Sequence, residues 1–127
     1  MLKKPEEGPT VFQLGGNDPD LMAEAARIAE EYGYCEMNIN CGCPSNKAGK
    51  WEFGASMMKK PDQVAKIAKR MKEECKVEVS VKCRLGVDDD DTYEYAWDFI
   101  KTVYEGSGVT KFYIHARKVF LQGLDPK

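Results

Sequence analysis

The chain has 127 residues, of which 43% are hydrophobic and 31% are charged, a composition typical of one globular unit with enough apolar side chains for a core. Its formal net charge of −2 and pI near 5.5 exclude binding of a phosphate backbone by this segment through charge alone, which needs a clustered basic surface. The absence of a long apolar run or a signal-peptide pattern predicts no membrane partner and a cytoplasmic location, with an organelle as the alternative.

The first predicted elements are a strand and a helix that follow a polar lead over residues 1–10. Residues 11–14 are the strand, Asp18 and Pro19 supply a helix cap and a first-turn proline, and Gly33 is a good helix terminator. The helix carries one apolar face, which we expect to pack on a sheet and which comprises Leu21, Met22, Ala25, Ala26, Ile28, Ala29 and Tyr32.

A second strand is predicted over residues 35–40, followed by a loop over 42–54 that is long for a connection from a strand to a helix. Long loops in compact domains are usually functional. Pro61 then begins a second helix, whose apolar residues recur at helical spacing and are Val64, Ile67, Ala68 and Met71.

The third strand alternates valines with polar residues from Val77 to Lys82, and an acidic run at 88–91 leads into a third helix. A fourth strand is predicted over residues 111–115. The apolar residues of the third helix are Tyr93, Ala96, Trp97, Ile100, Val103 and Tyr104.

Strands and helices therefore alternate, and this pattern predicts a parallel sheet of either a doubly wound fold or a barrel. Polar residues at the ends of several parallel strands favour the barrel, whose active site is built there. A full barrel takes about 250 residues, so we expect an α/β fold that is a partial (β/α)8 TIM barrel of about four βα units. The strand-end residues are Gln13, Asn38 with Asn40, Lys82 with Arg84, and His115 with Arg117.

The segment at 38–45 (NINCGCPS) is the most informative stretch for chemistry. Gly42 and Pro44 can fix a turn that holds the Cys43 thiol, which is mostly protonated at neutral pH and can act as a general acid. A buried structural cysteine is the alternative interpretation. The pair Cys41 and Cys43 also allows half of a metal site, but no second close pair occurs to complete it. We therefore expect no metal.

The five cysteines, an odd number without a secretory signal, predict reduced thiols. Lys82 lies on a strand whose alternate residues are valines, and burying its ammonium group is costly without an anionic partner such as a cofactor. His115 is the only histidine, and a strand-end histidine is more often structural than chemical.

Six short segments stand out together by their order and spacing: residues 13–19 (QLGGNDP), 38–45 (NINCGCPS), 53–55 (FGA), 81–86 (VKCRLG), 91–94 (DTYE) and 114–118 (IHARK). In combination they resemble the tRNA-dihydrouridine synthases, and within them the A-type branch that acts on uridines of the D-loop. The resemblance covers nearly the whole chain from Val11 onward.

The resemblance implies an FMN enzyme that reduces the C5–C6 double bond of uridine in tRNA, with NADPH as the reductant of the flavin. It places Cys43 at the family's proton donor, and Gln13, Lys82 and His115 at FMN-binding positions. Asn40 matches a position that contacts the tRNA.

Residues 11–127 correspond to the central part of the family's catalytic barrel. Its first and last strands and the C-terminal helical tRNA-binding domain lie outside this sequence, so another chain is an option for completing the barrel. The family usually has a glycine near Trp51 and an alanine–cysteine pair at Ala55 and Ser56, which predicts a different loop shape here.

Two alternative functions stay open. One is another FMN barrel that reduces free pyrimidines, although the segments at 91–94 and 114–118 favour the tRNA enzyme. The other is a non-catalytic half-barrel with a binding or structural role. Bound flavin would distinguish the second alternative from an enzyme.

Overall fold

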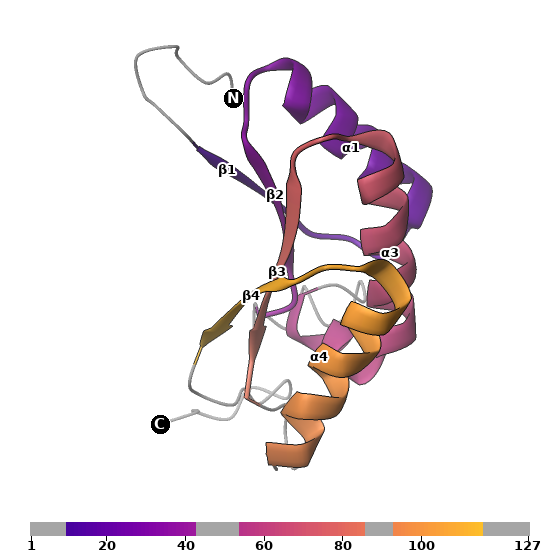
Figure 1. The fold of residues 1–127 in the computed structure, drawn as a ribbon, viewed down its shortest axis with the longest axis vertical. Helices are drawn as coiled ribbons and strands as arrows, with labels where there is room; N and C mark the ends of the chain where they lie inside the picture. The colour runs from indigo at the N-terminus through magenta and orange to yellow at the C-terminus, as the bar shows by residue number, and fades with distance from the viewer. Residues whose placement is uncertain (1–9, 43–53, 86–92, 116–127) are drawn as a thin grey trace.

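The structure, a computed structural model, describes residues 10–42, 54–85 and 93–115. Four parallel strands form one sheet in the order β1-β2-β3-β4, and all the α-helices lie on the same side of it (Figure 1). The strands are β1 (Val11–Leu14), β2 (Glu36–Asn40), β3 (Glu78–Arg84) and β4 (Lys111–His115). The helices are α1 (Pro19–Glu31), η2 (Gly54–Lys59, a 3-10 helix), α3 (Pro61–Glu74) and α4 (Tyr93–Ser107).

This arrangement confirms the predicted alternation of strands and helices and is consistent with part of a (β/α)8 barrel. Each predicted strand is present: β1 and β4 have the predicted boundaries, and the boundaries of β2 and β3 are shifted by a residue or two, whereas the 3-10 helix η2 was not predicted. The polar lead, the acidic run at 88–91 and most of the loop at 42–54 lie outside the described residues.

Helix α1 begins and ends at the predicted signals. The Asp18 carboxylate accepts hydrogen bonds from the backbone N–H groups of Asp20 and Leu21, at 2.9 and 3.2 Å. Those two N–H groups have no partner inside the helix, so the cap satisfies them. Gly33 follows the helix with φ = 91°, a conformation that side chains with a Cβ rarely adopt.

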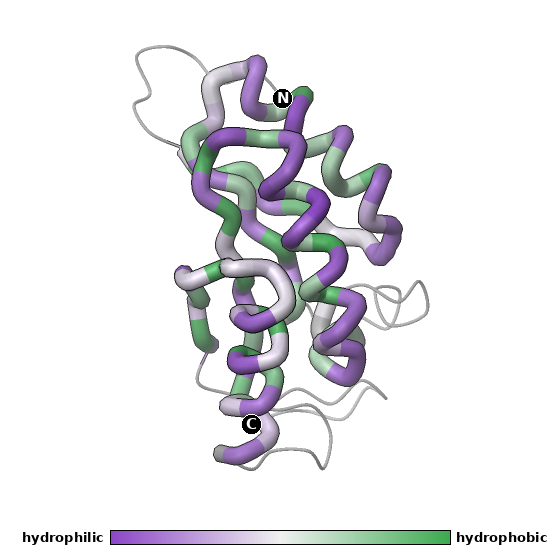
Figure 2. Tube along the Cα trace, turned by 45° about the vertical axis from the view of Figure 1, so that its right-hand side comes forward, coloured by the Kyte–Doolittle hydropathy of each residue, from purple (hydrophilic) through white to green (hydrophobic). Residues whose placement is uncertain are grey.

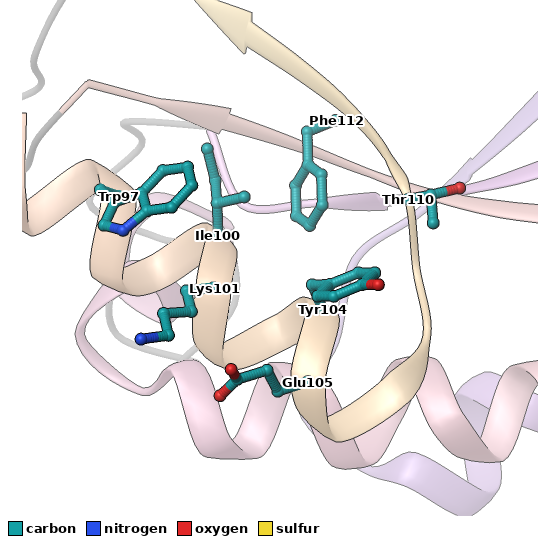
Figure 3. Close-up of a pocket in the computed structure, with 7 residues that line it drawn as sticks. All are labelled: Trp97, Ile100, Lys101, Tyr104, Glu105, Thr110 and Phe112. Atoms are coloured by element: carbon teal, nitrogen blue, oxygen red, sulfur yellow. The ribbon is translucent and has the colours of Figure 1, made fainter.

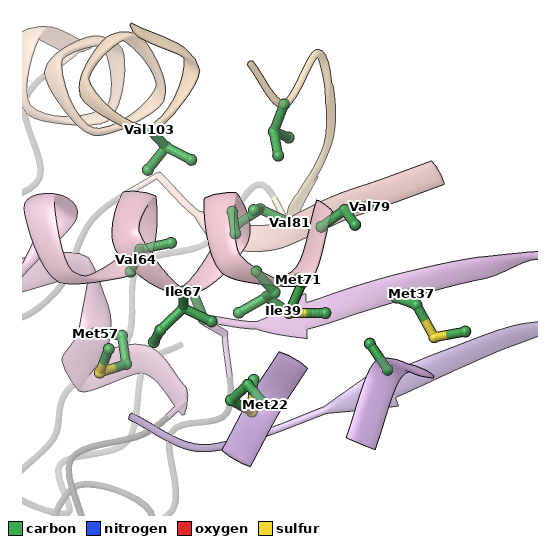
Figure 4. Close-up of a cluster of buried hydrophobic side chains, with 14 of the residues drawn as sticks. Met22, Met37, Ile39, Met57, Val64, Ile67, Met71, Val79, Val81 and Val103 are labelled. Carbon is green, nitrogen blue, oxygen red and sulfur yellow. The ribbon is translucent and has the colours of Figure 1, made fainter. Parts of the chain in front are cut away.

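The hydrophobic core lies between the sheet and the helices (Figure 4). Parallel pairing aligns Leu14, Ile39, Val81 and Phe112 across the four strands, so that one row of apolar side chains faces the helices. The predicted apolar residues of α3 are all buried: Val64, Ile67, Ala68 and Met71. Figure 2 shows the corresponding alternation of hydrophobic and hydrophilic residues along the helices.

Helix α3 is the centre of the helical layer, because it packs against both α1 and α4. Gly106 of α4 lies so close to Ala65 of α3 that a Cβ on Gly106 would come within 2.8 Å of the Ala65 Cβ. Only glycine permits this distance between the two helix backbones. The two helices are thereby held close together at the C-terminal end of α4.

The outer helices bury less of their apolar faces than the sequence predicts. Leu21 and Ile28 of α1 and Tyr32 at its C-cap are exposed, although Met22, Ala26 and Ala29 are buried. Trp97 and Tyr104 of α4 are likewise 61% and 52% exposed. Helical spacing identifies apolar positions but not how many neighbours cover them, and within the described ranges each of these helices packs against one other helix, α3.

Apolar hollows lie beside both edge strands. One, of about 380 Å³, lies between α4 and β4 and includes Trp97, Ile100, Tyr104 and Phe112 (Figure 3). The other, of about 290 Å³, lies between α1 and β1 and includes Phe12 and Ile28. Edge strands with unpaired backbone groups and adjacent apolar surface favour association.

None of the helices in the described ranges is long and apolar enough to cross a membrane.

We predict that the isolated 127-residue polypeptide self-associates, because both edges of the sheet and both apolar hollows are open in the part of the chain that the structure describes. Sedimentation velocity over a range of concentrations should show species larger than the 14.3 kDa monomer. Trp97→Lys should shift this distribution towards monomer. Asp98→Asn changes the charge by the same amount at the adjacent exposed position and should not. A sharp cooperative melt of a monomer in dilute solution would contradict the prediction.

Candidate functional site

The face of the sheet opposite the helices carries polar side chains from all four strands. Side chains along a strand point alternately to the two faces of the sheet. The residues in register with Gln13 therefore lie on this face, and so do the residues two positions before or after them in each strand. The first row consists of Gln13, Asn38, Ser80 and Lys111, and the second of Asn40, Lys82 and Tyr113. Arg84 and His115 pair in the row beyond.

Four of the five predicted site residues therefore share one face: Gln13, Asn40, Lys82 and His115. Cys43, the predicted catalytic residue, lies outside the described residues, as does Arg117. A hollow of about 350 Å³ on this face is lined by Val11, Gln13, Asn38, Lys82 and Tyr113. Two of the residues predicted to bind a cofactor thus contribute to one concave surface.

A chain of hydrogen bonds connects three strands across this surface. Gln13 Nε2 donates to Asn38 Oδ1 at 2.9 Å, and Asn38 Nδ2 donates to Ser80 Oγ at 2.8 Å. Ser80 Oγ in turn donates to Glu36 Oε2 at 2.6 Å. Asn38, Ser80 and Glu36 are buried, so the chain is shielded from water over most of its length.

Glu36 is the buried charged group on which this chain of hydrogen bonds ends. Its carboxylate also accepts hydrogen bonds from Lys111 Nζ and Tyr113 Oη, both at 2.9 Å. Burial opposes ionisation of the carboxyl group, but the hydrogen bonds from Ser80, Lys111 and Tyr113 outweigh it, and the pKa of Glu36 lies below its ordinary value. The hydrogen bond to Glu36 raises the pKa of Lys111 above its usual range.

Sequence reasoning missed Glu36, Ser80, Lys111 and Tyr113 as members of the polar face. The signal was present for Glu36, because it precedes Asn38 by two positions and must share its face in a strand. Nothing in the sequence indicated that Lys111 and Tyr113, on a different strand, are its partners. That pairing depends on the register between strands.

Lys82 is exposed at the hollow and forms no ion pair with another residue in the described ranges. The expectation that its ammonium group is buried is therefore wrong, because Lys82 lies on the face of the described sheet that no helix covers. Its positive charge remains available to an anionic or carbonyl group of a ligand in the hollow. His115 is also exposed on this face, one row further along.

The backbone that leads to Cys43 is held at its last described residue. Gly42 N–H donates to the Asn40 side chain at 2.9 Å, and Arg84 Nε donates to the Gly42 carbonyl oxygen at 2.7 Å. Both polar groups of Gly42 are therefore bonded to side chains of β2 and β3. The start of the loop is fixed at the edge of the polar face.

Cys41 differs from the polar residues on either side of it. It points towards the helices and is fully buried in the core. Burial, together with the neighbouring Cys83 thiol, holds the pKa of Cys41 well above its usual range, and burial raises the pKa of Cys83 to about 12. Both are structural core residues in their un-ionised form.

The four cysteines among the described residues are free thiols, as the sequence predicts, and of these only Cys35 is exposed. Over the ranges that the structure describes, no group of three histidine, cysteine or acidic side chains is placed to hold a metal ion.

Comparison with known proteins identifies the family. Residues 1–123 match the family described as Dihydrouridine synthase (Dus). The chain is 48% identical over 122 residues to the tRNA-dihydrouridine(20/20a) synthase of Vibrio parahaemolyticus, and the match covers 96% of the chain and 37% of the relative. It is 46% identical over 123 residues to the enzyme of the same name from Synechocystis sp., with 97% and 36% covered.

The chain thus spans little more than a third of the length of these relatives. The matched region includes every strand of the described sheet and every predicted site residue. The chain therefore belongs to the dihydrouridine synthase family.

Proposed function

We propose that this chain forms the central part of an enzyme that reduces uridine to 5,6-dihydrouridine in the D-loop of tRNA, with FMN as cofactor and NADPH as reductant. Residues 11–127 would be the middle of its catalytic barrel. The observation that carries the proposal is the shared polar face on which Gln13 and Lys82 line one hollow. Its relatives bear the name of that activity.

The residues of the hollow fit the ring of a flavin. Val11 and Tyr113 supply apolar and aromatic surface, while Gln13 and Lys82 supply an amide and a cation. An isoalloxazine ring combines an extended apolar plane with carbonyl oxygens and a ring N–H, which these groups complement. When bound, the flavin supplies the hydride for reduction of the base. Lys82 would stabilise negative charge on the ring, and His115 would contact it from the next row.

Cys43 would donate the proton that completes the reaction. Reduction of the C5–C6 double bond adds a hydride at C6 and a proton at C5, and a thiol with an ordinary pKa is protonated at neutral pH and able to supply that proton. The Gly42 backbone next to it is held by Asn40 and Arg84, which would limit the positions that the thiol reaches. Asn40 would also contact the tRNA.

The tRNA substrate has to present its uridine outside the stacked helix, because a base inside folded RNA cannot reach a pocket on a barrel face. The net charge of −2 leaves little electrostatic attraction for RNA within these residues. Most of the phosphate contacts would therefore come from parts of the enzyme outside this chain. A half-barrel without activity is the alternative that the open hollow and open sheet edges favour.

We predict that the 127-residue chain alone binds FMN weakly or not at all. In barrels, the phosphate site is usually formed by the loops after strands 7 and 8, which leaves only contacts to the ring here. Titration of FMN, followed by quenching of its fluorescence, should show no saturation at submicromolar concentrations. Any weak binding should fall further in Lys82→Ala and persist in Lys69→Ala, which removes an exposed lysine of α3. Submicromolar binding with full occupancy would contradict this prediction.

The proton-donor role can be tested in the completed enzyme, the full-length form of which this chain would be the central part. Cys43→Ala should slow uridine reduction by about 10²–10⁴-fold, the usual contribution of a positioned acid, and leave flavin binding and NADPH oxidation nearly intact. The measurement is the dihydrouridine yield in a single turnover with pre-reduced flavin.

Cys41→Ala is the matched control for that experiment. It removes a thiol two positions away that is buried in the core, so it should lower thermal stability with a much smaller effect on the rate of the chemical step. Equal yields from Cys43→Ala and the parent enzyme would exclude Cys43 as the acid.

A further inference from the structure

We infer that Glu36 sets the direction of the hydrogen-bond chain through Ser80 and Asn38, so that Gln13 presents its carbonyl oxygen to a ligand in the hollow. Gln13 and Lys82 together would then recognise a cyclic imide, a ring N–H next to a carbonyl group. Glu36 acts here as a positioning residue for ligand recognition. The identity of the ligand rests on the proposed function, whereas the direction of the chain does not.

The first step of the argument is the carboxylate. An ionised carboxylate only accepts hydrogen bonds, and Glu36 receives three, from Ser80, Lys111 and Tyr113. The lowered pKa keeps Glu36 ionised at neutral pH. The single hydroxyl proton of Ser80 is therefore committed to Glu36 Oε2, at 2.6 Å.

The second step follows from the inventory of donors. Because Ser80 has used its proton, its oxygen can only accept from Asn38, and the Asn38 side chain must turn its NH2 group towards Ser80. Asn38 Oδ1 then faces Gln13 and must receive a donor, which is Gln13 Nε2 at 2.9 Å. Reversing Asn38 would bring two acceptors together at a buried position, against Ser80. Reversing Gln13, which is exposed, would set its carbonyl oxygen against that of Asn38 and lose the hydrogen bond between them.

The third step concerns the group that remains. With Nε2 of Gln13 bonded to Asn38, its Oε1 has no hydrogen-bond partner among the described residues. Gln13 of β1 and Lys82 of β3 line the same hollow across β2, and the Lys82 ammonium group only donates. An acceptor and a donor that face one hollow complement a ligand with an N–H and a carbonyl oxygen. Both the flavin ring and the uracil base carry such a group, so the test has to separate these two sources.

Glu36→Gln should reverse the direction of the hydrogen-bond chain without a change in side-chain shape. Lys111 can only donate, so the oxygen of the new amide would face Lys111 and its nitrogen would face Ser80. Ser80 would then donate to Asn38, Asn38 would turn its NH2 group towards Gln13, and Gln13 would present its Nε2 to the hollow. The expected result is an exchange of acceptor for donor at the ligand.

The direction of the chain can be measured without any ligand, by NMR of the side-chain amide protons in the 127-residue polypeptide. In the parent, the Asn38 amide protons should show contacts to the Ser80 β-protons, whereas in Glu36→Gln they should show contacts to Gln13. Glu78→Gln is the matched control, because Glu78 lies 3.8 Å from the same Lys111 but has no bond to Ser80. Its spectrum should keep the parent pattern. The same Asn38 pattern in the parent and in Glu36→Gln would overturn the inference.

The consequence for recognition is measured in the completed enzyme as a preference between two ligands. Binding of FMN is compared with binding of 3-methyl-FMN, and in the flavin-loaded form binding of uridine is compared with binding of 3-methyluridine. The parent should prefer the unmethylated member of one pair by about tenfold, the effect of one hydrogen bond. This ratio should fall towards one in Glu36→Gln and in Ser80→Ala and stay unchanged in Glu78→Gln. The pair whose ratio changes identifies the flavin or the base as the group at Gln13.

The methyl group adds the same steric bulk in every variant. The test therefore depends on how the preference for the unmethylated ligand changes from one variant to another. If neither ratio changes in Glu36→Gln, the inference is overturned. A parent enzyme that binds no flavin but shows the expected amide contacts would instead contradict the proposed function and support the assigned direction of the chain.

Discussion

The ionised carboxylate of Glu36 is the interaction on which the polar face of the sheet depends. A buried charge is costly unless donors surround it, and here the donors come from Ser80 of β3 and from Lys111 and Tyr113 of β4. These bonds join three strands on the side away from the helices. A surface that no helix covers is thereby held in one arrangement, and a single charge fixes the direction of its amide groups.

The other face of the sheet follows a different physical rule. Its apolar rows are covered by α1, α3 and α4, and the burial of each helix depends on the number of its neighbours. The central α3 is flanked on both sides and buries its whole predicted face. The outer helices leave aromatic and aliphatic residues exposed beside β1 and β4, which is the arrangement expected of βα units that continue a barrel on either side.

Much of the fold could be predicted because its signals are local. Asp18, Pro19 and Gly33 mark the ends of α1, and the alternating valines of β3 identify both its conformation and its buried side. The common face of Gln13, Asn38 and Lys82 followed from strand ends in a parallel sheet. The partners of Glu36 could not be predicted, because they depend on the register of β3 against β4 and on side-chain lengths across three strands. The exposure of Lys82 and Trp97 could not be predicted either, because it depends on which elements pack against each surface and not on local spacing.

The strand periodicity of β2 also explains why two cysteines so close in sequence have different environments. Glu36, Asn38 and Asn40 alternate with Met37, Ile39 and Cys41, so the rule that builds the polar face also sends the Cys41 thiol into the core. A thiol that serves the polar face from this segment must therefore follow the end of the strand. At that point Gly42 leaves the strand with its N–H and its carbonyl oxygen bonded to Asn40 and Arg84, two side chains of the polar face itself. The segment that leads to Cys43 is thus tied to the surface on which the proposed reaction would take place.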